Sequence, residues 1–271
     1  MAAVKDVFEF LDGLAAFDTQ LDFDNAGFLV GRSDRQVRRL LVSLDITEEV
    51  AEEAGALGAE LIVSHHPVIF HPAKSITDRD PVGRTLLALT EHGIAAICAH
   101  TNLDAAVGGV NDALAARLGL SDTVVLEPSG TDRLGRPIGI GRAGNAPADA
   151  PASTAEYAAF VKRALGANGV RYVDAGRPVR RVAVGGGACG DMGHLALALG
   201  CDTFVTSDVK YNQFLDARDL GLNLIDAGHY PTEHVICPIL ADALRKAFPE
   251  VEVTLTKRHR EVFSYLSLIH I

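Results

Sequence analysis

The stretch Arg38-Arg39-Leu40-Leu41-Val42, followed by Leu61-Ile62-Val63-Ser64, decides how this chain is expected to fold. Without gaps, 142 positions further along the chain, Arg180-Arg181-Val182-Ala183-Val184 is followed by Thr203-Phe204-Val205-Thr206. In both copies the apolar runs flank a segment with helical character that ends in Leu-Gly. An internal repeat of this kind indicates two copies of one strand–helix–strand unit.

A third pair of matching segments extends each copy. Gly93–Ala99 resembles Gly221–Ala227, and each is followed by polar residues and then a predicted helix, over residues 110–118 and 234–247. Strands that alternate with helices form a mostly parallel or mixed sheet with helices packed on it. We therefore predict an α/β protein with two similar halves, each a mostly parallel or mixed sheet flanked by helices, and a metal-binding cleft between them.

The boundary between the halves is expected in residues 127–152, which are rich in Gly, Pro, Asp and Arg. This composition is typical of turns, here around one short strand at residues 137–140. The first half is thus predicted over residues 1–127 and the second over 128–265, where a helix at 153–165 and a strand at 169–174 come first. The last residues, 266–271, match the in-frame translation of a sequencing adapter and are expected to be an artefact.

Composition narrows the class of protein. The net charge of −10 argues against a nucleic acid as the main partner, because phosphate binding requires clustered Lys and Arg.

The N-terminus has acidic residues in an amphipathic helix and does not resemble a signal peptide, and no run reaches the roughly 18–20 apolar residues of a membrane span. The 4 cysteines form no C-x-x-C pair and are typical of core thiols in a reducing compartment. We expect a cytoplasmic protein.

Candidate metal ligands follow the predicted strands. His65 and His66 come directly after Leu61-Ile62-Val63-Ser64, and Pro67 then breaks the strand and lets both imidazoles face one side. Ligands of open α/β sheets collect beyond the carboxyl ends of the strands. A single histidine near a strand end is more often an ordinary hydrogen-bonded residue, but an adjacent pair after a buried strand favours the metal interpretation.

Further candidates follow the third strand of each half. Asp104 comes after Gly93–Ala99, and His229 and Glu233 come after Gly221–Ala227. Alternatively, Asp104 belongs to a simple turn, and Glu233 lies in the first turn of a helix capped by Thr232. Three imidazoles and two carboxylates suit two ions of zinc, manganese, iron, cobalt or nickel, and suit calcium poorly. The predicted ligands are His65, His66, Asp104, His229 and Glu233.

Two other features leave alternatives open. His100 lies close to Asp104 in the sequence and would serve as a ligand, as a partner of a ligand or as a proton carrier. The turn Gly185–Gly190 matches G-x-G-x-x-G, with Asp208 near the position of a ribose-binding acid. The matching turn of the first half has no glycines, so we favour a turn that brings the backbone close to the site, where it would face an anionic substrate.

These motifs together resemble the YbgI-like and Nif-three-like dinuclear-metal proteins (DUF thirty-four), often labelled type 2 homologues of GTP cyclohydrolase I. The resemblance runs from about Val4 to Phe248. It is carried by Asp24-Asn25-Ala26-Gly27, His65-His66-Pro67, His100-Thr101-Asn102-Leu103-Asp104, Gly185-Gly186-Gly187, Ser207-Asp208-Val209-Lys210-Tyr211, and Asp226-Ala227-Gly228-His229 with Glu233. It implies two similar α/β domains, a ring-shaped homohexamer, and two divalent metals bound by the five predicted ligands.

Two functions are compatible with such a site. As an enzyme, the protein would be a metal-dependent hydrolase of a phosphoester, an amide or a ring C–N bond, with water activated by the metals. In that case His100, Asp208 or Lys210 would position a small anionic substrate or move protons. The GTP cyclohydrolase label rests on the resemblance alone, because the sequence contains no P-loop. The alternative is a non-catalytic protein that stores, delivers or senses metal.

Overall fold

The computed structural model describes residues 2–266 and divides into two compact units. Within the described part of the chain, unit 1 contains residues 2–106 and 236–260, and unit 2 contains residues 107–235 and 261–266. The units therefore differ from the contiguous halves 1–127 and 128–265 expected from the sequence. Of the adapter-like segment 266–271, residues 267–271 lie outside the described part of the chain.

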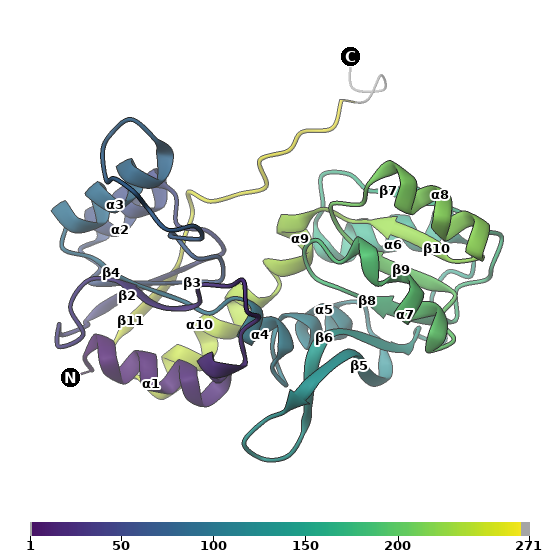
Figure 1. The fold of residues 1–271 in the computed structure, drawn as a ribbon, viewed down its shortest axis with the longest axis horizontal. Helices are drawn as coiled ribbons and strands as arrows, with labels where there is room; N and C mark the ends of the chain where they lie inside the picture. Colours follow the sequence, from purple (N-terminus) through teal and green to yellow (C-terminus); the bar gives the residue numbers. More distant parts are fainter. Residues whose placement is uncertain (1, 267–271) are drawn as a thin grey trace. The chain divides into compact units, whose positions relative to one another are not determined.

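Unit 1 is built on a five-stranded sheet in the order β1-β4-β3-β2-β11 (Figure 1). Its strands are β1 (Gly27–Val30), β2 (Arg39–Ser43), β3 (Leu61–Ser64), β4 (Ala95–Cys98) and β11 (Glu252–Leu255). Four of them run parallel, whereas β1 pairs with β4 in the antiparallel direction. The central strands consist of buried apolar residues because helices cover both faces of the sheet.

The helices of unit 1 are α1 (Val4–Leu14), a 3-10 turn (Phe17–Thr19), α2 (Glu48–Leu57), α3 (Pro81–Glu91), α4 (Thr101–Ala105) and α10 (Ile236–Ala247). Helices α2 and α3 pack on one face of the sheet, and α1 and α10 lie on the other (Figure 1). Leu41 and Ile62 point toward α2 and α3 in one apolar cluster. Because side chains alternate along a strand, their neighbours Leu40 and Leu61 face the opposite helices.

Unit 2 contains a six-stranded mixed sheet in the order β5-β6-β8-β9-β10-β7. Its strands are β5 (Ser121–Thr131), β6 (Pro137–Asn145), β7 (Arg171–Val173), β8 (Arg181–Val184), β9 (Thr203–Thr206) and β10 (Asn223–Asp226). Strands β8, β9 and β10 are parallel, and the others pair antiparallel to their neighbours. The fold class predicted from the sequence, two helix-flanked sheets of α/β type, is confirmed.

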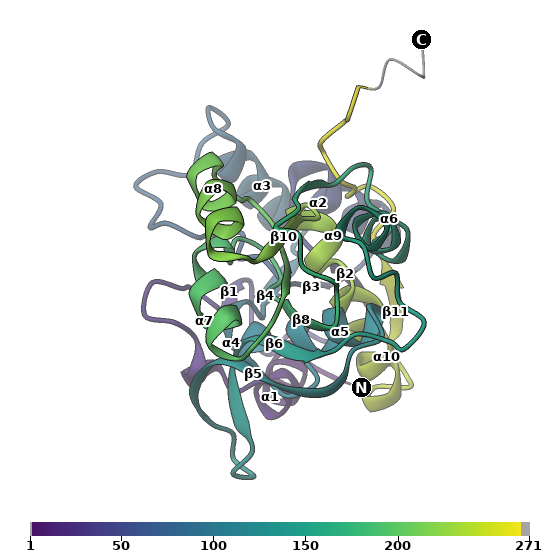
Figure 2. The same ribbon diagram turned by 90° about the vertical axis from the view of Figure 1, so that its right-hand side faces the viewer.

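The helices of unit 2 are α5 (Val110–Arg117), α6 (Thr154–Leu165), a 3-10 turn (Gly190–Met192), α7 (Gly193–Ala198), α8 (Tyr211–Leu220) and α9 (His229–Glu233). Figure 2 shows α7 and α8 on one face of the sheet and α6 on the other. Val182 and Ile225 belong to the apolar cluster under α5 and α6, while Ala183 and Leu224 belong to the cluster under α7 and α8. No helix among the described residues is long and apolar enough to cross a membrane.

Two elements explain the unit boundaries. Helix α5 follows α4 in the sequence, yet its Leu114 is buried in the core of unit 2 with Tyr157. Helix α10 follows α9 of unit 2, yet it packs on β2 and β11 of unit 1. The chain therefore leaves each unit directly after the short helix that carries candidate ligands. The region 127–152 is also more regular than expected, because β5 and β6 form a long hairpin with a turn at residues 132–136.

The sequence repeat extends to a buried carboxylate beside the first strand of each copy. In unit 1, Glu60 accepts hydrogen bonds from the backbone N–H groups of Arg38 and Arg39, at 2.9 and 2.8 Å. In unit 2, Asp202 accepts hydrogen bonds from the backbone N–H groups of residues 180 and 181, at 3.0 Å each. Burial alone would raise the pKa of Glu60, but these bonds, together with those from the Arg38 side chain, lower it.

Candidate metal centre

In unit 1, three neighbouring parallel strands end at the same edge of the sheet, and each is followed by polar side chains. Asp45 follows β2, the pair His65 and His66 follows β3, and His100 follows β4. Asp104 is one helical turn beyond His100, on α4. The edge predicted from the sequence to collect ligands thus brings the first-half candidates together.

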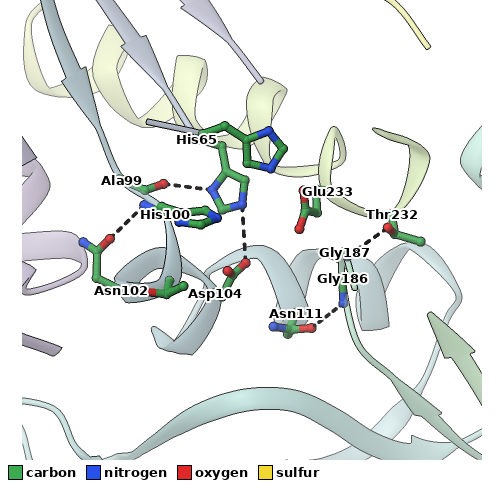
Figure 3. Close-up of polar contacts among 12 residues, drawn as sticks. His65, Ala99, His100, Asn102, Asp104, Asn111, Gly186, Gly187, Thr232 and Glu233 are labelled. Atoms are coloured by element: carbon green, nitrogen blue, oxygen red, sulfur yellow. Dashed lines mark hydrogen bonds and ion pairs between the residues drawn. The ribbon is translucent and has the colours of Figure 1, made fainter. Parts of the chain in front are cut away.

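The geometry of this cluster suits a metal ion. One ring nitrogen from each of His65, His66 and His100 lies within 4.8 Å of the others. Oδ1 of Asp104 is 3.5 Å from Nε2 of His65 (Figure 3). His65 is fully buried, and the side chains of His66 and His100 are 19% and 15% exposed. Burial of this many imidazoles beside a carboxylate is costly unless the group binds a proton or a cation.

Hydrogen bonds fix the tautomer of all three imidazoles. Nδ1 of His65 lies 2.8 Å from the backbone oxygen of Ala99, which only accepts (Figure 3). Nδ1 of His66 lies 2.8 Å from Oδ1 of Asp45, and Nδ1 of His100 lies 2.7 Å from Oδ1 of Asp24. Because carbonyl and carboxylate oxygens accept, Nδ1 carries the proton in each ring, and Nε2 of the neutral ring carries the lone pair. This is the arrangement of histidines that bind metals through Nε2.

Asp24 is ionised at neutral pH. Burial alone would raise its pKa, but hydrogen bonds from His100 and Thr101 outweigh that effect and lower it to about 2. Its second oxygen accepts hydrogen bonds from the backbone N–H and the hydroxyl of Thr101, at 3.0 and 2.5 Å. Asp24 therefore fixes the His100 ring and the start of α4 together, and α4 carries Asp104.

A further histidine lies behind His66. Nε2 of His259 is 3.2 Å from Oδ2 of Asp45, whose other oxygen holds His66. The side chain of His259 is 10% exposed. The segment that carries it is attached to α2, because the backbone N–H of Lys257 donates to Oε1 of Glu53 at 2.9 Å. His259 thus belongs to the hydrogen-bonding chain that orients His66.

Unit 2 repeats this design at the ends of β8, β9 and β10. Gly187 follows β8, Asp208 follows β9, and α9 with His229 and Glu233 follows β10. Oδ2 of Asp208 lies 2.6 Å from Nδ1 of His229, and Oε2 of Glu233 lies 3.0 Å from Nε2 of the same ring. A neutral imidazole cannot donate to both carboxylates, so a second proton or a shared cation is required between His229 and Glu233. The four-residue spacing on one helix places both side chains on the same face.

Asp208 adopts an uncommon backbone conformation, with φ of 52°. Aspartate tolerates the left-handed region better than most residues, and here the conformation presents the carboxylate to His229. Asp208 thus orients His229, a candidate ligand. Lys210, the third residue predicted to act on substrate, is the N-cap of α8. Its backbone N–H donates to Oε1 of Gln213 at 2.7 Å, and its side chain is exposed.

The backbone N–H groups of the glycine-rich turn donate to side chains of unit 2. The N–H of Gly186 donates to Asn111 and that of Gly187 to Thr232, at 3.0 and 3.1 Å (Figure 3). A Cβ at Gly187 would collide with the carboxylate of Glu233. The glycine therefore makes room for a candidate ligand. Thr232 is not the cap of the helix; Gly228 is the N-cap of α9.

Each unit, taken by itself, therefore presents donor atoms of the kind that a divalent transition metal prefers. Four imidazoles, His65, His66, His100 and His229, have Nδ1 fixed by an oxygen acceptor. Two carboxylates, Asp104 and Glu233, face an Nε2 atom. Mixed imidazole and carboxylate ligands are preferred by zinc, manganese, iron, cobalt and nickel. The sequence reasoning missed the orienting roles of Asp24, Asp45 and His259. Asp45 lies just beyond a predicted strand and Asp24 belongs to a motif of the resemblance, but neither position points to a histidine partner.

Comparisons with known proteins identify relatives of this chain. A curated relative from Clostridium perfringens, described as "GTP cyclohydrolase 1 type 2 homolog", is 30% identical over 97% of this chain and 99% of the relative. One from Streptomyces coelicolor with the same description is 35% identical over 90% of this chain and 86% of its own length. The crystal structure of a hypothetical protein from Staphylococcus aureus superposes with a TM-score of 0.90 at 29% identity, covering 97% of this chain and 99% of that one. The family model Duf34/NIF3 (NGG1p interacting factor 3) matches residues 2–261, and this chain belongs to that family.

Proposed function

We propose that this chain binds two divalent metal ions and uses them in hydrolysis. The proposed ligands are His65, His66 and Asp104 of unit 1 with His229 and Glu233 of unit 2. The observation that carries the proposal is the tautomer shared by the proposed histidine ligands. In each of them an oxygen acceptor holds the proton on Nδ1, which leaves Nε2 as the donor for a metal.

Bound divalent ions would act as Lewis acids toward a substrate oxygen and would make water more acidic. The chain's own residues supply the remaining parts. His100, fixed by Asp24, exchanges a proton at Nε2 at the rim of the cluster. Asp208 holds His229 in place, and the exposed ammonium of Lys210 attracts an anionic substrate. The relatives' description as GTP cyclohydrolase homologues makes ring C–N hydrolysis one of the reactions to test.

The decisive assay is a substrate panel. Metal-depleted protein is incubated with GTP, phosphoesters and small cyclic amides after zinc, manganese, iron or nickel is added back. We expect metal-dependent turnover that disappears in Asp104→Ala and persists in His194→Ala. The control removes an exposed histidine of unit 2 whose Nδ1 lies 3.0 Å from the backbone oxygen of Asp191. Circular dichroism confirms that each variant is folded.

A negative panel has a specific meaning. If every substrate fails while the metals bind tightly and exchange to an acceptor protein or chelator, hydrolysis is rejected and the protein stores or delivers metal. The ring-shaped homohexamer remains a separate proposal, which light scattering tests directly. A monomer at micromolar concentration would contradict it.

A further inference from the structure

Two large apolar rings are exposed near the metal cluster of unit 1. Phe23 is 65% exposed and Phe70 is 39% exposed. They contact each other edge to face, with ring centroids 6.4 Å apart and an angle of 62° between the planes. A single exposed phenylalanine is ordinary. A contacting pair exposes a continuous apolar surface to water, which is unfavourable in free energy, and such surfaces often mark binding sites.

The pair is continuous with the imidazoles. The Phe70 ring lies 6.1 Å from the His100 ring, at 83°. His100 in turn lies 5.2 Å from His65 and 5.4 Å from His66. A row of rings thus leads from the buried candidate ligands to the exposed Phe23. A molecule lying over the phenylalanines would reach the imidazoles with its other end.

The rings are exposed on anchored loops. The loop of Phe23 continues into Asp24, whose buried carboxylate is bonded to α4 and to His100. Asn25 connects the two loops, because its side-chain N–H donates to the backbone oxygen of Ile69 at 2.6 Å. The loop from His66 to Asp80 has no regular secondary structure, and loops of this length are commonly functional. Anchoring on both sides holds the ring surface ready, which reduces the entropic cost of binding.

We infer that Phe23 and Phe70 form a platform on which a planar heteroaromatic ring of the substrate stacks, while its reacting end points toward His100. This inference rests on the proposed function and adds the substrate class. The faces of phenyl rings bind other flat rings by stacking, largely irrespective of their hydrogen-bonding pattern. Asp22, the neighbour of Phe23 in the sequence, is also exposed, which favours a neutral or cationic ring over an anionic one.

The chain contains no tryptophan, so Phe23→Trp introduces a single fluorescent reporter that still stacks. Guanosine and adenosine serve as flat probes, and ribose serves as the probe without an aromatic ring. We expect saturable quenching by both nucleosides and none by ribose. Phe70→Leu in the Phe23→Trp background should weaken the nucleoside affinity by about tenfold or more, since it keeps the apolar bulk and removes a ring face.

Phe263→Trp is the matched control, because Phe263 is an exposed phenylalanine of unit 2, 56% exposed. Linear, non-saturating quenching that is equal in Phe23→Trp and Phe263→Trp would overturn the inference. So would a change of oligomeric state in Phe23→Leu without any nucleoside binding, because the rings would then cover a second copy of the chain. Metal content is measured on the same samples. A protein that shows saturable quenching but takes up no added metal would count against the proposed metal centre and leave the platform standing. A protein that binds metal but shows no quenching would remove only the platform.

Discussion

Replacing Gly187 with alanine tests whether the glycine-rich turn exists to admit the carboxylate of Glu233. Gly187 has φ of +67°, and a Cβ there would lie 3.1 Å from Cδ of Glu233, 3.2 Å from Nε2 of His229, and far inside contact distance of Oε1 of Glu233. Glu233 is only 3% exposed, so its carboxylate has little room to retreat. Gly187→Ala should therefore displace a proposed ligand.

Gly166 provides a matched control for the backbone. It also has φ of +67°, at the C-terminal end of α6, and nothing lies within 4 Å of the position of its Cβ. Backbone strain should cost both alanine variants about 1–2 kcal/mol of unfolding free energy, because an L-residue is strained in this conformation. The collision with Glu233 should add to this loss in Gly187→Ala alone. Only Gly187→Ala should also bind metal about 10–100-fold more weakly, the range found when the surroundings of metal ligands are disturbed.

Denaturant unfolding measures the first effect, and competition with a chromophoric chelator measures the second. The reasoning is refuted if Gly187→Ala binds metal as tightly as the wild type. It is equally refuted if Gly166→Ala weakens metal binding to the same extent, because the loss would then reflect general destabilisation.

Glu60→Gln should lower the unfolding free energy by about 1–3 kcal/mol, because a buried charged acceptor is lost. Since the folded-state pKa of Glu60 is lowered, the wild type should lose this stabilisation as the pH falls below the ordinary value of 4.5, and the pH dependence of unfolding should be flatter in the variant. His259→Ala should weaken metal binding about tenfold through Asp45, whereas His92→Ala should not; equal chelator competition curves would contradict this role. Asp24→Asn should alter the pH–rate profile of turnover measured per bound metal ion, and an unaltered profile would exclude the orienting role of Asp24 toward His100.

The fold class was predictable because both copies of the repeat keep apolar strand segments at equivalent positions. The runs that became β2 and β8 are apolar and lie at equivalent positions, as do those that became β3 and β9. Histidines directly after a buried strand had to appear at its carboxyl edge, which is why His65 and His66 were found from the sequence. Their common orientation depends on the oxygen acceptors that the fold supplies.

Features that depend on distant packing were not predictable. The sequence of helix α10 does not indicate that it belongs to unit 1. Its place follows from packing on β2 and β11, which become neighbours only in the folded sheet. Strand β5 was missed because most of its residues are exposed and it contains Pro128 and Gly130, which are rare in strands. Asp24 is 76 positions from the histidine that it orients, so no local pattern reveals the contact.

Metal stoichiometry tests the central claim most directly. Wild-type protein is stripped with a chelator, reconstituted with zinc or manganese, desalted and analysed by mass spectrometry of the metal, beside His65→Ala, Glu233→Ala and the control His194→Ala. The two-metal proposal predicts about two ions per chain in the wild type and the control, and a clear loss in both ligand variants although they alter different units. Wild-type protein without bound metal, or ligand variants that retain the full wild-type content, would contradict it.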